Sequence, residues 1–127
     1  MASTSLPDDI RRFVLTSVPS VPFVEALLLF RGSDEAIDIG HVSSRLYISE
    51  QAASQVVAQL RETGIVEPAA NGTAYRYAPR NDELGSLLDR LATFYATHLI
   101  EVTQLIHSRT ERAARQFADA FKLRKEP

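Results

Sequence analysis

Apolar residues recur at helical spacing on both sides of a tight joint in the segment Ile39–Tyr77. Val42 and Leu46 lie before the joint, and a second, longer apolar run follows Ile48. The members of that second run are Ala52, Ala53, Val56, Val57 and Leu60. Gly64 ends the run, since glycine readily takes the positive φ found at many helix C-termini. The pattern therefore predicts two helices joined by a short turn.

The first predicted helix spans His41–Tyr47 and the second spans about Ser49–Thr63, with Ser49 as its N-cap. Ile65 and Val66 then begin a strand, and Asn71-Gly72 is a strong signal for a hairpin turn. Aromatic and charged residues alternate over Tyr75–Tyr77, which is typical of the second strand of the hairpin. This order is typical of a helix-turn-helix followed by a β-hairpin wing. In such a unit the second helix presents its polar N-terminal face to the major groove of DNA.

Two more helices are predicted ahead of this unit. The first begins at Pro7 and is broken by the prolines of Val18–Pro22. The second covers about Val21–Phe30, with Ser20 as its cap. Within Ser33–Ile39 two isoleucines alternate around an aspartate, a spacing that fits a short strand paired with the wing.

From Asn81 onward the pattern is helical almost to the end of the chain, in alternating steps of four and three residues. The stripe consists of Leu84, Leu88, Leu91, Tyr95, His98, Val102 and Leu105. One small winged helix cannot cover a stripe of this length, so we predict that it forms the interface of a homodimer. An intramolecular helical hairpin, hinged at His107–Thr110, is the alternative. The predicted organisation is mainly α with a small β-hairpin wing: residues 1–80 form the winged helix-turn-helix domain with its N-terminal helix, and residues 81–127 form a C-terminal helical dimerisation segment.

The run VSSRLYISEQAASQVVAQLRETGIVEP with the following turn at Asn71-Gly72 resembles the winged helix-turn-helix core of bacterial transcription regulators of the MarR type and the related ArsR and PadR types. The resemblance covers roughly Phe23–Pro79. It implies a homodimer that reads a pseudo-palindromic operator, with one recognition helix in each half-site and the wing on flanking backbone or minor groove. The chain departs from the MarR pattern at Glu67-Pro68, where a basic residue is usual, and in a wing that offers Arg76 without the Asp-x-Arg signature.

The candidate DNA-binding residues are Arg45, Ser49, Gln51, Ser54, Gln55 and Arg76. Glutamine can pair bidentately with adenine, and serine can donate to a phosphate or a base. The alternative for the glutamines and serines is a solvated helix face, and for Arg76 an ordinary edge strand. Gly40–Arg80 holds four arginines and three glutamates, a net charge of +1, which predicts weak nonspecific binding because few phosphates are neutralised.

Composition limits the remaining possibilities. A chain of 127 residues that is 45% hydrophobic suits one domain with an appended helix, and its net charge of -2 argues against a protein that coats nucleic acid. There are no cysteines, which excludes disulfides and thiolate metal sites in this chain. No apolar run approaches the ~20 residues of a membrane span. We therefore expect a cytoplasmic protein without a membrane partner.

No catalytic constellation is evident in the sequence. The three histidines are far apart and have no metal-ligand spacing, and there is no glycine-rich phosphate loop. We predict that the chain is not an enzyme and needs no cofactor or metal, and no small-molecule effector is specified. Two functions remain: a homodimeric transcription regulator that binds double-stranded DNA, or a winged-helix module for protein interaction or assembly.

Overall fold

The computed structural model describes residues 6–70 and 72–125, with backbone alone at 110–114, 117 and 119–125. The described chain contains six helices and one three-stranded antiparallel sheet. Their order is α1 (Asp8–Ser17), α2 (Val21–Arg31), β1 (Ile37–Asp38), α3 (Ile39–Leu46), α4 (Glu50–Glu62), β2 (Val66–Pro68), β3 (Ala74–Tyr77), α5 (Asp82–Thr97) and α6 (Leu99–Lys125). The predicted fold class, a mainly α winged helix-turn-helix with an added C-terminal helical part, is confirmed.

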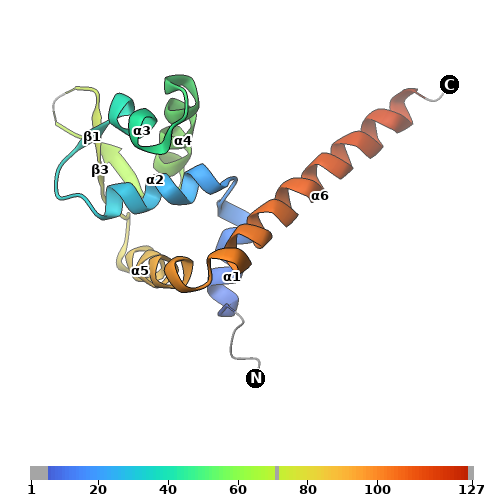
Figure 1. Ribbon diagram of the computed structural model, residues 1–127, viewed down its shortest axis with the longest axis horizontal. Coiled ribbons are helices and arrows are strands. Elements are labelled where there is room, and N and C mark those ends of the chain that lie inside the picture. The colour runs from blue at the N-terminus through green and yellow to red at the C-terminus, as the bar shows by residue number, and fades with distance from the viewer. Residues whose placement is uncertain (1–5, 71, 126–127) are drawn as a thin grey trace.

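The winged helix occupies one end of the molecule, where α2, α3 and α4 pack together beside the sheet (Figure 1). The strand order is β1-β3-β2, so the return strand of the wing lies in the middle. Ile37 of β1 pairs with Tyr75, which confirms the predicted strand before the helix-turn-helix. Ile39 does not extend that strand. It begins α3 because the Asp38 carboxylate accepts the His41 N–H at 2.8 Å and caps the helix.

The other predicted helix ends are also observed. Ser20 accepts the Phe23 N–H at 3.4 Å at the start of α2, and Ser49 accepts the Ala52 N–H at 3.0 Å at the start of α4. Gly64 follows α4 with a φ of 84°, and the Ile65 N–H donates to the Leu60 carbonyl at 3.0 Å. These local hydrogen bonds fix the ends of the helices that form the helix-turn-helix.

The C-terminal part bends at His98, between α5 and α6. Thr93 and Thr97 donate their hydroxyls to backbone carbonyls four residues earlier, an arrangement that often bends helices. His98 then leaves the helical conformation at φ -128° and ψ 46°, with its ring against Phe94 at a centroid distance of 5.2 Å. The alternative with a hinge at His107–Thr110 is not observed, since α6 passes through this segment as one helix.

The bend wraps α5 and α6 around α1, which contacts both of them. Leu88, Leu91 and Val102 are consequently fully buried in the core of the described chain. These three positions of the predicted dimer interface are thus core positions here, and the interface itself stays a prediction. Its other four positions remain only half-buried and lie at the edge of the core: Leu84, Tyr95, His98 and Leu105.

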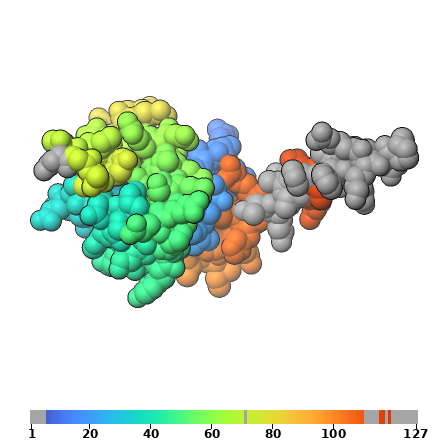
Figure 2. Space-filling view, turned by 90° about the horizontal axis from the view of Figure 1, so that it is seen from above, coloured from blue at the N-terminus to red at the C-terminus, as the bar shows by residue number. Residues whose placement is uncertain are grey.

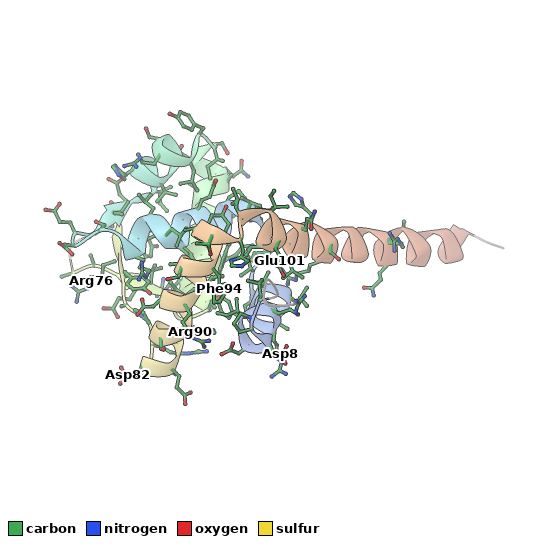
Figure 3. All side chains as sticks on the ribbon, turned by 60° about the horizontal axis from the view of Figure 1, so that its bottom comes forward. Asp8, Arg76, Asp82, Arg90, Phe94 and Glu101 are labelled. Atoms are coloured by element: carbon green, nitrogen blue, oxygen red, sulfur yellow. The ribbon has the colours of Figure 1, made fainter. Side chains whose placement is uncertain are left out.

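Ion pairs attach the C-terminal helices to the rest of the chain. Arg90 of α5 pairs with Asp9 of α1, and its hydrogen bond holds the pKa of Asp9 below the usual value. Glu101 of α6 lies 3.8 Å from the Arg11 guanidinium and also accepts the Leu6 N–H at 3.3 Å (Figure 3). The core is continuous from α1 to α6, so the division of the chain near residue 80 stays a prediction.

Candidate nucleic-acid interface

Helix α4 has one buried side and one exposed side. Ala53, Val56, Val57 and Leu60 are buried, and α4 contacts α2 and α3. The opposite side exposes the predicted DNA-binding residues of the helix and its cap, Ser49, Gln51, Ser54 and Gln55, which we call the reading face. A helix of 13 residues is about 20 Å long, so its N-terminal half can enter a major groove.

Ser49 of the reading face is first of all a structural residue. Its hydroxyl oxygen accepts the Ala52 N–H, and its hydroxyl hydrogen can still donate to a phosphate or a base. The other three members are on α4 itself, and Gln51 and Gln55 are four positions apart, so they share one side of the helix. Together they can recognise a base edge by hydrogen bonding without any charge.

The turn between α3 and α4 is held by three hydrogen bonds to or from Ser43. The N–H groups of Tyr47 and Ile48 both donate to its carbonyl, and its hydroxyl donates to the Ile48 carbonyl at 2.6 Å. Tyr47 adopts the left-handed conformation, with φ 58° and ψ 44°, and its side chain is 93% exposed. This conformation costs a non-glycine residue about 1–2 kcal/mol. Sequence patterns gave no signal for it, because glycine is the usual residue in such a position.

The wing carries Arg76 at its exposed surface, at the end of the molecule opposite the projecting part of α6 (Figure 3). In the β2–β3 register Arg76 stands opposite Glu67, and its Nε lies 3.4 Å from a Glu67 carboxylate oxygen. The two side chains are 63% and 53% exposed, so the pair is screened by water and adds little stability. Gly72 has a φ of 95° as expected for the hairpin turn, whereas Asn71 lies outside the described residues.

Tyr77, the last residue of β3, is partly buried where the wing joins the rest of the chain. The Tyr77 hydroxyl is buried without a hydrogen-bond partner among the described residues. Burial raises the pKa of Tyr77, and the nearby Asp89 carboxylate raises it further, so this phenol is neutral at physiological pH. Asp89 is itself bound to Arg31 of α2 at 2.9 Å. The wing contacts α2 through β3 and α4 through β2.

The four arginines counted in the sequence are spread over the surface. Arg45 is exposed in the last turn of α3, and the exposed Glu50 opens α4. Arg61 lies in the last turn of α4, and Arg80 covers Gly64, where an added Cβ would lie 3.0 Å from its Cδ. The basic side chains at the two ends of α4 therefore do not gather into one patch. The N-terminal end of α4, with one arginine and one glutamate, is close to neutral.

A second exposed surface lies at the bend between α5 and α6. Leu99 and Ile100 are 50% and 71% exposed, although both are large and apolar. The stripe predicted from the sequence passes through His98 and Val102, on either side of these two residues. That prediction treats α5 and α6 as one uninterrupted helix. The bend at His98 changes which side chains face outward.

A metal-binding cluster and a single membrane-spanning helix are not found in the described part of the chain. The described residues contain no group of three or more acidic or histidine side chains able to hold a metal ion. Among the described helices, none is by itself long and apolar enough to cross a membrane. Helices α1 and α2 reach that length and composition only together, and they are bent by 113° with their apolar residues in the core.

The structure is similar to that of reduced HlyU from Vibrio cholerae N16961, with a TM-score of 0.52 and 24% sequence identity. The similarity covers 69% of this chain and 92% of the HlyU chain. At this identity it shows a shared winged helix-turn-helix fold. No family model and no curated protein sequence matches the chain.

The helix cap at Ser49 predicts how substitutions of this residue change the stability of the chain, independently of any DNA binding. Ser49→Ala should lower the free energy of unfolding by about 1 kcal/mol, because the Ala52 N–H loses its acceptor. Ser49→Asp should retain the stability of the native chain, since aspartate is an equally good cap. Urea unfolding followed by circular dichroism measures both. Equal stability of the alanine variant and the native chain would show that the cap is not formed in solution.

Proposed function

We propose that the chain is a DNA-binding transcription regulator that acts as a homodimer, with α4 in the major groove. The observation that carries this proposal is the reading face: one side of α4 is packed into the core, and the other side is exposed, polar and free of large apolar residues. The winged helix-turn-helix fold shared with HlyU supports a DNA-binding function. The HlyU structure is that of the reduced protein, whereas this chain has no cysteine and so cannot use a thiol switch.

In this proposal some contacts recognise the base sequence, and others position the protein on the DNA backbone. Gln51 and Gln55 would reach base edges, while Ser54 and Arg45 would hold phosphates beside the groove. Arg76 would contact the flanking backbone or minor groove once a phosphate replaces its partner Glu67. This exchange is feasible because the ion pair is exposed and weak. The MarR-like subgroup remains a prediction from the sequence.

The proposed homodimer forms through α5 and α6. Leu99 and Ile100 provide exposed apolar surface at the bend, and α6 projects beyond the body of the chain (Figure 1). Figure 2 shows the first part of α6, in orange, beside α1 and on the side of the body away from the wing. The half-buried Leu84, Tyr95, His98 and Leu105 would extend this surface. A near-neutral reading face binds DNA weakly by itself, and linking two of them raises the affinity by making the second contact intramolecular.

A protein-interaction or assembly module is the second candidate. The pairing of Arg76 with Glu67 and the position of Glu50 at the start of α4 favour it, since both reduce the positive potential that attracts DNA. In that case the same exposed surfaces would contact a protein, and duplex DNA would not bind at low salt.

Glu67→Gln distinguishes these two functions. The change removes a negative charge and frees Arg76, so we expect mixed-sequence duplex DNA to bind several-fold more tightly, with a salt dependence steeper by about one phosphate contact. Fluorescence anisotropy at two or more salt concentrations measures both quantities. Glu62→Gln is the matched control, because it makes the same charge change at the C-terminal end of α4. Absence of DNA binding by the native chain and by Glu67→Gln at low salt would contradict the DNA-binding proposal.

The dimer proposal is tested by Ile100→Glu. A carboxylate in an apolar interface must be desolvated, so we expect the variant to sediment as a monomer at concentrations at which the native chain is a dimer. Ser86→Glu adds the same charge at an exposed polar position of α5 and should leave the dimer intact. A monomeric native chain, or a dimer that persists in the Ile100 variant, would show that the interface lies elsewhere or does not form.

A further inference from the structure

Tyr47 occupies the turn of the helix-turn-helix in a conformation that favours glycine. It is the one non-glycine residue with positive φ in the described part of the chain, and its side chain is the most exposed of the large apolar and aromatic residues there. A side chain that is 93% exposed gains almost nothing from packing. The fold therefore gives no reason for a tyrosine here, and it would be at least as stable with glycine.

The backbone around Tyr47 fixes the point and direction from which its side chain leaves the turn. Both Tyr47 and Ile48 donate their N–H groups to the Ser43 carbonyl, and the Ser43 hydroxyl donates to the Ile48 carbonyl. Leu46 and Ile48, on either side, pack against the core. The phenol consequently extends from a rigid base, and because tyrosine has only two side-chain torsions, little conformational freedom remains to be lost when it contacts a partner.

The neighbours of Tyr47 belong to the proposed DNA interface. Arg45 is exposed two residues earlier, and Ser49 of the reading face is exposed two residues later. Tyrosine hydroxyls are among the neutral groups that donate to phosphate oxygens and so set the register of a protein on the duplex. Such a donor matters most where charge is scarce, and the N-terminal end of α4 carries one arginine and one glutamate.

We infer that Tyr47 is a DNA-positioning residue whose hydroxyl donates to a backbone phosphate beside the groove entered by α4. This inference rests on the proposed function and adds to it a contact that releases no counterion. Loss of Tyr47 should therefore weaken binding without changing its salt dependence, whereas loss of Arg45 should reduce the salt slope by about one phosphate contact.

The test compares Tyr47→Gly, Tyr47→Phe and Arg45→Ala in the full chain. The probe is a fluorescein-labelled mixed-sequence duplex, and anisotropy is followed from about 50 mM salt upward. We expect Tyr47→Gly to unfold at an equal or higher urea concentration than the native chain and yet to bind about tenfold more weakly, as for the loss of a hydrogen bond to a charged group. Tyr47→Phe should lose most of the same affinity and keep the native stability. Arg45→Ala should differ from both by its shallower salt slope.

Three results would overturn the inference. Native affinity in Tyr47→Gly would show that the side chain makes no contact with DNA and would leave the proposed function intact. Native affinity in Tyr47→Phe would exclude the hydroxyl as a phosphate donor. No binding by the native chain would remove the proposed function and the role of Tyr47 together, and this outcome is recognised before any variant is compared.

Discussion

Burial of one side of α4 is the constraint on which the rest of the structure depends. Ala53, Val56, Val57 and Leu60 hold the helix against α2 and α3, and each fully buried valine or leucine contributes about 1.5–3 kcal/mol. Rotation of α4 about its axis would expose this apolar side and bury glutamines without partners. The direction of the reading face is therefore set by the core.

The turn and the wing extend this constraint to the ends of α4. At its N-terminal end, Ser43 and the cap at Ser49 fix the angle with α3. At its C-terminal end, Gly64 reverses the chain into the sheet, where the Arg80 N–H donates to the Gly64 carbonyl at 2.9 Å. The wing is thereby positioned relative to α4 by backbone hydrogen bonds, and its surface residue Arg76 can vary without loss of the fold.

The apolar stripe of the helices after the wing is divided between the core of the chain and the proposed dimer interface. The bend at His98 assigns Leu88, Leu91 and Val102 to the core of one chain and leaves Leu99 and Ile100 outside. Helix α1 has only 10 residues, and α5 and α6 pack against it and share its core. The proposed homodimer would use the apolar side chains that the bend leaves exposed, Leu99 and Ile100.

Local signals predicted the helix-turn-helix well, because caps, glycines and periodicity act within a few residues. Such signals predicted the helix caps at Ser20 and Ser49, the helix end at Gly64 and the strand at Ile37. The bend at His98 could not, since the heptad-like spacing continues across it, and whether α1 or another chain covers the stripe depends on tertiary packing. The exposure of Tyr47 and the pairing of Arg76 with Glu67 depend on φ and strand register, which residue patterns do not specify.

In the proposed function two copies of α4 read one DNA site. Duplexes bound by the full chain can be selected from a random-sequence pool and sequenced. We expect enrichment of an inverted repeat whose half-sites are about 10 base pairs apart, or a multiple of one helical turn. Recovery of a pool without sequence enrichment, or of a single unrepeated half-site, would contradict it.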